Sequence, residues 1–149
     1  MRLVIQRVTQ ASVEIDGKIR GEIQDGFMVL VGINNKDNEI IIDKMVDKLI
    51  HLRIFEDENE KLNLSLLDVK GSILSISQFT LYANCKKGRR PSFLEAAKPE
   101  ISKPLYEKFN EKIREKGIHI ETGEFGAMME VRLNNSGPTT IIMDSEEIV

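Results

Sequence analysis

The sequence contains very few of the residues from which several kinds of site are built. Its 149 residues include one cysteine, two histidines and no tryptophan. A single cysteine, Cys85, cannot form an internal disulfide, which fits a reducing compartment. Two histidines and one cysteine that lie far apart in the sequence argue against a zinc site. The chain also has no glycine-rich loop of the dinucleotide or Walker type. We therefore expect neither a metal ion nor a nucleotide cofactor.

Long apolar runs and an excess of one charge are missing as well. No apolar run approaches the roughly 18 residues of a membrane-crossing helix, and residues 1–7 lack the features of a secretory signal. The 21 Lys and Arg against 24 Asp and Glu give a formal net charge of −3, which argues against binding of nucleic acid over the whole surface. We expect a cytoplasmic protein without a membrane segment, folded as one domain over residues 1–149.

What the sequence does contain is a pattern of short β-like runs and two helical segments. We predict strands over 2–8, 11–15, 18–23, 27–33, 72–81, 118–121, 127–134 and 139–144. The run 27–33 is apolar on both faces and is therefore expected at the centre of a sheet. Helices are predicted from an Asn38 cap to Leu52, and from Pro99 or Pro104 to Lys116. The pattern predicts a strand-rich α/β (α+β-like) domain of mixed or antiparallel sheets or a barrel with two main helices.

The histidines do not suggest a catalytic base. His51 lies four residues after Asp47 on the polar face of the first predicted helix, where an ion pair is the expected role. His119 stands between Ile118 and Ile120, so in a strand it points away from their face. Without a base beside it, a serine or threonine hydroxyl is a poor nucleophile.

Two segments place unusual groups within the predicted strands. The stretch Ser77-Gln78-Phe79-Thr80 puts polar side chains in a buried-looking run, where they either pair internally or face a ligand at the end of the strand. Backbone N–H groups there could also form an oxyanion hole. Gly137-Pro138 is expected as a hairpin turn between the last two strands, and so tight a turn raises the frequency of a cis X-Pro bond above its low base rate. A glycine there also lets the backbone approach a ligand closely.

These two segments closely resemble the signatures of the D-aminoacyl-tRNA deacylase (D-tyrosyl-tRNA(Tyr) deacylase) family. The family has a Ser-Gln-Phe-Thr stretch and an Asn-Xaa-Gly-Pro-Val-Thr stretch; here they read Ser77-Gln78-Phe79-Thr80 and Asn135-Ser136-Gly137-Pro138-Thr139-Thr140. Thr139 departs from the usual valine, a nearly isosteric change that leaves the Gly-Pro backbone unaffected. Further matches extend along the chain at residues 4–8, 11–13, 88–93 and 123–128.

The resemblance implies an enzyme that cleaves the ester between a D-amino acid and the terminal adenosine of tRNA. It also implies action on glycyl-tRNA mischarged on the alanine tRNA. Family members are homodimers in which a Gly-cis-Pro segment enters the partner's pocket, where the carbonyl oxygens of Gly137 and Pro138 would bind the substrate's amino group and leave no room for an L side chain. The same device cannot reject glycine, which has no side chain.

The resemblance also suggests roles for individual residues. Backbone N–H groups around Gln78 and Phe79 would bind the developing oxyanion, and the ribose 2′-hydroxyl of the substrate would help to activate water. Thr80 would act as a positioning or hydrogen-bonding group, and Arg7 would brace the Gly-Pro segment. Phe125 would line the adenine pocket or serve as a core aromatic. Four cations in five residues would contact acceptor-stem phosphates or form a solvated loop: Lys86, Lys87, Arg89 and Arg90.

The sequence is also compatible with two other functions. A non-enzymatic RNA-binding or dimerisation module could have kept the same fold. A hydrolase for a different ester or amide could use Thr80 as its nucleophile.

Overall fold

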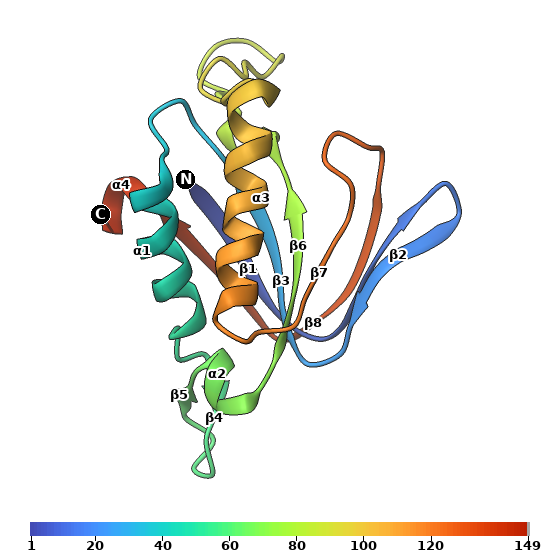
Figure 1. The fold of residues 1–149 in the computed structure, drawn as a ribbon, viewed down its shortest axis with the longest axis vertical. Helices are drawn as coiled ribbons and strands as arrows, with labels where there is room; N and C mark the ends of the chain where they lie inside the picture. The colour runs from blue at the N-terminus through green and yellow to red at the C-terminus, as the bar shows by residue number, and fades with distance from the viewer. Residues whose placement is uncertain (149) are drawn as a thin grey trace.

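A six-stranded mixed sheet forms the frame of the protein (Figure 1). The computed structural model describes residues 1–148. The strand order is β2-β1-β3-β6-β7, with β8 pairing β1, and β1 is antiparallel to its neighbours while β3, β6 and β7 run parallel. The mixed sheet expected from the sequence is thus confirmed. The strands are β1 (Arg2–Ile15), β2 (Lys18–Ile23), β3 (Gly26–Gly32), β6 (Ser72–Ser77), β7 (Ile120–Thr122) and β8 (Glu130–Asp144).

The sheet curves towards a barrel because β1 is long enough to serve two sets of neighbours. Residues 2–8 of β1 pair with β3, residues 11–15 pair with β2, and β8 follows both halves. The far edges also come together, since a Cβ built on Gly21 of β2 would lie 3.1 Å from the Thr122 carbonyl oxygen of β7. The hairpin turn between β1 and β2 lies at Asp16-Gly17, with φ of 50° and 76°, as is typical of an Asp-Gly pair between two strands.

Two helices cover one face of the sheet (Figure 1). Helix α1 (Glu39–Ile50) starts at Asn38, whose side chain accepts a 3.1 Å hydrogen bond from the backbone N–H of Ile41, as expected of a cap. Helix α3 (Pro99–Glu115) starts at the first of the two prolines considered, with Pro104 inside it. Smaller elements are β4 (Phe55–Glu56), β5 (Leu62–Leu64), α2 (Leu66–Val69), the 3₁₀ helix η1 (Phe79–Tyr82) and α4 (Ser145–Ile148).

The apolar side chains form two clusters on opposite faces of the sheet. The larger cluster lies between the sheet and the helices and includes Phe27, Met45 and Phe109, all fully buried. The smaller cluster fills the concave side around Val13 and Leu74. The strand β3 contributes to both clusters and is almost entirely buried, which confirms its predicted central position.

One predicted strand is shorter than the sequence pattern indicated. The expectation of a strand over 72–81 is wrong beyond Ser77, where β6 ends. Its neighbour β3 ends at Gly32, so the ladder has no further partner strand on that side. The chain turns instead into η1, where the backbone N–H of Leu81 donates to the Gln78 carbonyl and that of Ala83 donates to the Thr80 carbonyl.

The Gly137-Pro138 segment is not a hairpin turn between two strands. The structure has one continuous strand, β8, and both sides of the segment pair with β1. The pairing register shifts between Gln6 and Val8 and again between Val8 and Gln10, so the segment bulges out of the ladder without reversing the chain. The Gly137-Pro138 peptide bond is cis, as expected. The predictions of separate strands over 2–8 and 11–15, and over 127–134 and 139–144, were therefore wrong in dividing β1 and β8.

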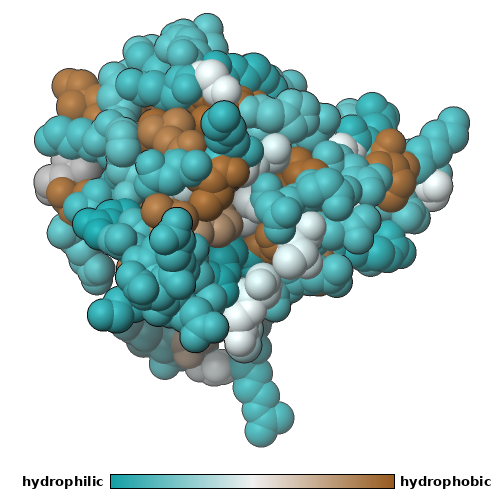
Figure 2. Space-filling view, turned by 90° about the horizontal axis from the view of Figure 1, so that it is seen from below, coloured by the Kyte–Doolittle hydropathy of each residue, from teal (hydrophilic) through white to brown (hydrophobic). Residues whose placement is uncertain are grey.

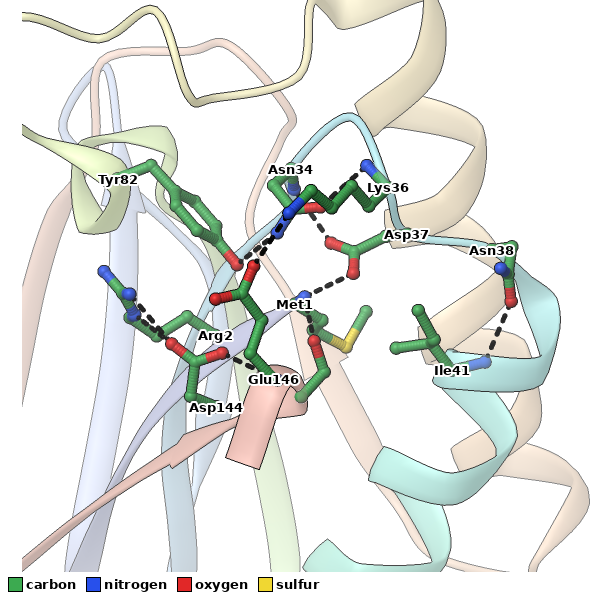
Figure 3. Close-up of polar contacts among 11 residues, drawn as sticks. Met1, Arg2, Asn34, Lys36, Asp37, Asn38, Ile41, Tyr82, Asp144 and Glu146 are labelled. Atoms are coloured by element: carbon green, nitrogen blue, oxygen red, sulfur yellow. Dashed lines mark hydrogen bonds and ion pairs between the residues drawn. The ribbon is translucent and has the colours of Figure 1, made fainter. Parts of the chain in front are cut away.

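The beginning of β1 and the end of β8 meet beside the loop that leads into α1 (Figure 3). The Met1 amino group contacts the Asp37 carboxylate and lies 2.6 Å from the Ser145 hydroxyl. Among residues 1–148, no helix is long and apolar enough to span a membrane.

Candidate active site

A cavity of about 550 Å³ lies where β6 ends and η1 begins. Ser77, Gln78 and Phe79 form one side of it. The start of α3 and the segment that leads into β8 form the other sides. The walls are largely apolar and include Val31, Ile76, Phe93, Ala97, Phe125 and Met129. The first signature segment thus lies at a concave site, as expected for residues that meet a ligand at the end of a strand.

Aromatic rings stand at both sides of this cavity. Phe79 and Phe93 pack edge to face with ring centroids 5.2 Å apart, and both are partly exposed. Phe125 lines the cavity while its ring lies 6.0 Å from that of Tyr106 on α3. Phe125 therefore packs on the protein and also lines the cavity, and its role towards adenine stays a prediction. Exposed rings beside a cavity are suited to stacking on a nucleic-acid base.

Among residues 1–148, backbone N–H groups remain available as donors at the start of η1, where Phe79 lines the cavity. The N–H of Gln78 is not one of them, since it donates a 2.8 Å hydrogen bond to the Val31 carbonyl. Within residues 1–148, the N–H groups of Phe79 and Thr80 have no acceptor. Of the two residues around which oxyanion donors were expected, Gln78 has its N–H engaged by the sheet and Phe79 does not. The role of these groups towards an oxyanion stays a prediction.

The Thr80 side chain does not line the cavity. Its hydroxyl oxygen accepts a 2.5 Å hydrogen bond from the side-chain amide of Gln78. Neither histidine lines the cavity, and both pair with carboxylates on the surface: His51 with Asp47 at 3.4 Å and His119 with Glu121 at 3.2 Å. The surface positions of the two histidines match what was expected from the sequence. Within the described part of the chain, no group of three His, Cys, Asp or Glu side chains could hold a metal ion.

Gly137 and Pro138 do not line this cavity. The neighbouring Arg7 pairs with Phe27 on β3, whereas the cavity residue Ser77 pairs with Val31. The two levels are four residues apart along β3, which is about 13 Å of strand. Both Gly137 and Pro138 are exposed to solvent. Seen from below, the surface of the molecule is mostly hydrophilic with scattered hydrophobic patches (Figure 2). The two signature segments therefore lie apart in the folded chain.

Arg7 holds the Gly137-Pro138 segment from the adjacent strand. Its guanidinium is buried, and it donates to the Ser136 carbonyl at 3.1 Å and to the Ile54 carbonyl at 2.8 Å. A carboxylate oxygen of Glu56 lies 3.9 Å away. Gly137 itself has φ of +122°, and a Cβ built on it would lie 2.9 Å from an Arg7 nitrogen and 2.6 Å from the Thr139 hydroxyl. The backbone here requires glycine for both conformation and space.

The four cations at residues 86–90 lie on an exposed loop close to the cavity. The loop is closed by a bridge between Asn84 and Ser92, and the next residue, Phe93, lines the cavity. None of the four side chains has an ion-pair partner among residues 1–148. In Figure 1 this segment is part of the yellow-green loop at the top, near the start of α3.

Comparisons with known proteins agree over the whole chain. Residues 4–144 match the family model of D-Tyr-tRNA(Tyr) deacylase. A D-aminoacyl-tRNA deacylase of Bacillus pumilus (strain SAFR-032) is 63% identical over 99% of this chain and 100% of that protein. One of Thermus aquaticus is 56% identical over 99% of this chain and 97% of that protein. The chain thus belongs to the D-Tyr-tRNA(Tyr) deacylase family. It is an enzyme of the hydrolase class, as its sequence motifs indicated.

Solved structures show the same fold. A c-Myc DNA unwinding element binding protein matches with a TM-score of 0.91 and 39% identity, over 97% of this chain and 98% of that one. A probable eukaryotic D-amino acid tRNA deacylase matches with a TM-score of 0.83 and 20% identity, over 95% of this chain and 97% of that one. The second likeness bears on the fold alone.

Proposed function

We propose that the protein hydrolyses the ester bond of D-aminoacyl-tRNA, and of glycyl-tRNA mischarged on the alanine tRNA. The products are free tRNA and the D-amino acid or glycine. Family membership supports the reaction class. The observation that carries the proposal is a pair of backbone N–H groups without an acceptor among residues 1–148: one belongs to Phe79, which lines the apolar cavity, and the other to the next residue, Thr80.

In the proposed reaction, water attacks the ester carbonyl carbon. The carbonyl oxygen takes up the negative charge, and the N–H groups of Phe79 and Thr80 donate to it. The bond between that carbon and the ribose oxygen then breaks, and a proton from the attacking water ends on the ribose oxygen. The substrate's 2′-hydroxyl helps to activate the water. This route needs no histidine, which fits the surface positions of His51 and His119.

Chiral selection is assigned to Gly137 and Pro138 of a second copy of the chain. Their carbonyl oxygens would bind the substrate's amino group and close the space that an L side chain needs, while glycine passes. The segment is exposed and stands about 13 Å of strand away from its own cavity, so it is free to enter that of a partner. Arg7 braces the segment through the Ser136 carbonyl.

The remaining contacts concern the tRNA. Phe125 would stack on the terminal adenine, as its exposed side in the cavity allows. Lys86, Lys87, Arg89 and Arg90 would contact acceptor-stem phosphates, which explains why four cations without protein partners gather beside the cavity.

The decisive assay compares D-tyrosyl-tRNA, L-tyrosyl-tRNA and glycyl-tRNA as substrates of the wild-type protein. We expect fast hydrolysis of the D and glycyl esters and no acceleration for the L ester. A pure RNA-binding module would leave all three esters at their spontaneous rates. Equal rates for the D and L esters would contradict the chiral filter while preserving the hydrolase.

A complementation experiment tests the shared site. Phe79→Glu damages the cavity and Gly137→Ala damages the inserted segment, so each homodimer has two defective sites. A mixed dimer would have one site with both defects and one with neither. Because half of a randomly mixed population is mixed dimer, about a quarter of wild-type activity should return. If the mixture stays as inactive as its components, the segment does not act in the partner's cavity.

The rival with Thr80 as nucleophile is tested by Thr80→Ala. Loss of a true nucleophile costs on the order of 10⁴-fold or more in kcat. Because the Thr80 hydroxyl accepts from Gln78 outside the cavity lining, we expect a loss below about tenfold. Complete loss of activity in a folded variant would restore the nucleophile.

A further inference from the structure

Arg2, the first residue of β1, contacts both segments that carry the family signatures (Figure 3). Its Nη1 donates a 2.7 Å hydrogen bond to the carbonyl of Leu81 in η1, directly after Ser77–Thr80. Its Nε and Nη2 lie 2.9 and 2.8 Å from a carboxylate oxygen of Asp144, the last residue of β8. The same strand β8 carries Gly137 and Pro138.

A second contact fixes the plane of the Arg2 guanidinium. Its central carbon lies 4.7 Å above the centre of the Tyr82 ring, also in η1. Tyr82 is buried, and its hydroxyl accepts a 3.2 Å hydrogen bond from the Asn34 side chain. Arg2 therefore holds η1 at two successive residues, by a backbone carbonyl and by a ring. A planar guanidinium is suited to both contacts at once, whereas a lysine ammonium is not.

We propose that Arg2 is a positioning residue for the hydrolysis: it fixes η1, and with it the N–H groups of Phe79 and Thr80, in register with β8. This inference rests on the proposed function, because it requires those N–H groups to meet the oxyanion. Other contacts hold η1 as well, among them the backbone hydrogen bonds from Leu81 to Gln78 and from Ala83 to Thr80 and the bond between Tyr82 and Asn34. Arg2 differs from these because it also links η1 to Asp144 at the end of β8. An oxyanion donor must keep its place to within a few tenths of an ångström, and a displacement of about 1 Å costs up to about a hundredfold in rate.

The test compares Arg2→Ala, Arg2→Lys and the control Arg132→Ala. Arg132 forms a 2.9 Å ion pair with Glu14 between the same two strands, but on the surface and away from η1. For Arg2→Ala we expect kcat on D-tyrosyl-tRNA to fall by about ten- to a hundredfold, with KM changed by less than about twofold. Arg2→Lys should keep the attraction to Asp144 and restore thermal stability, yet recover only part of kcat. Arg132→Ala should behave as wild type.

Amide hydrogen exchange supplies a readout that does not depend on catalysis. In Arg2→Ala the amides of Leu81 and Ala83 should exchange at least about tenfold faster, because their hydrogen bonds lie within η1. The Gln78 amide, bonded to the Val31 carbonyl in the sheet, should be unchanged and serves as an internal control. Unchanged exchange at Leu81 and Ala83, or a kcat equal to that of Arg132→Ala, would overturn the inference. A wild-type protein that leaves D-tyrosyl-tRNA intact would contradict the proposed function instead, and the exchange rates would still decide whether Arg2 holds η1.

Discussion

The Nε atom of Arg7 donates a 3.1 Å hydrogen bond to the carbonyl oxygen of Ser136, the residue that precedes Gly137. The same buried guanidinium donates to the Ile54 carbonyl at 2.8 Å, so it ties the Gly137-Pro138 segment to the chain just before β4. Arg7 therefore determines where the exposed Gly137 and Pro138 carbonyls stand.

Replacing Arg7 by lysine keeps the positive charge. The lysine ammonium, however, cannot donate to the Ser136 and Ile54 carbonyls at the same time, as the planar guanidinium does. We expect the free energy of unfolding to fall by about 1–3 kcal/mol, since a buried acceptor loses its donor. The kcat/KM for D-tyrosyl-tRNA should fall by about tenfold, because the segment that binds the amino group is no longer braced. Chemical denaturation and the deacylation assay measure the two effects. Wild-type kinetics in a destabilised Arg7→Lys protein would show that Arg7 has a structural role only.

Gly137→Ala should damage the protein by two separable effects. Its φ of +122° is unfavourable for alanine, and the added Cβ would lie 2.6 Å from the Thr139 hydroxyl and 2.9 Å from Arg7. Gly117 is the matched control, because it has φ of +80° after α3 but nothing within 4 Å of a built Cβ. Gly117→Ala should cost about 1 kcal/mol of stability and no activity. Gly137→Ala should cost more stability, and most of the activity on D-tyrosyl-tRNA. Equal behaviour of the two variants would contradict the proposed role of the segment.

The elements were predictable where local pattern decides the structure. The Asn38 cap, the apolar stripe of α1 and the Asp16-Gly17 turn are local signals, and the structure has all three. The end of β6 was not predictable, because it is set by where β3 stops and not by the residues 78–81 themselves. The continuity of β8 through Gly137-Pro138 likewise depends on β1, which pairs on both sides of the bulge.

The site was predictable in part and for a similar reason. Short motifs identified Ser77–Thr80 and Gly137-Pro138, but spacing along the chain could not show that the fold keeps them apart. Nor could it show which N–H groups are free, since the hydrogen bond from Gln78 to Val31 exists only in the sheet. Arg2 gave no signal at all, because an arginine at the start of a strand is ordinary until its contacts with Leu81 and Asp144 are seen.

Neutralising the loop cations should weaken tRNA binding only by removing their contacts with the tRNA phosphates. If Lys86, Lys87, Arg89 and Arg90 are all changed to glutamine, the slope of log K against log salt should become shallower by up to about 3 units. The D-to-L preference should be unchanged, since chirality is selected elsewhere. A control with the same charge change uses four exposed lysines remote from the cavity: Lys18, Lys44, Lys48 and Lys70. Deacylated tRNA can serve as the titrated ligand. An equal loss in both variants would mean that net charge, and not the loop, governs binding.

The ion pair between Arg2 and Asp144 should give the stability a defined dependence on pH. Burial by itself raises the pKa of the Asp144 carboxyl, but the Glu146 backbone N–H and the Arg2 guanidinium outweigh it and hold this pKa below the usual value of 3.8. A carboxyl whose pKa is lower in the folded than in the unfolded protein stabilises the fold above the unfolded value, and this stabilisation is lost as the pH falls through the folded one. Asp144→Asn should therefore be less stable than wild type at pH 7, by up to about 1 kcal/mol. The difference should shrink as the pH falls below about 4, because wild-type Asp144 then becomes neutral as well.

Comparing the two proteins cancels the contributions of the other carboxyls. Thermal denaturation from pH 7 to pH 2.5 measures the difference, and in an Arg2→Ala background it should be smaller at every pH. A difference that stays constant over this range would show that Asp144 acts by packing and not by its charge.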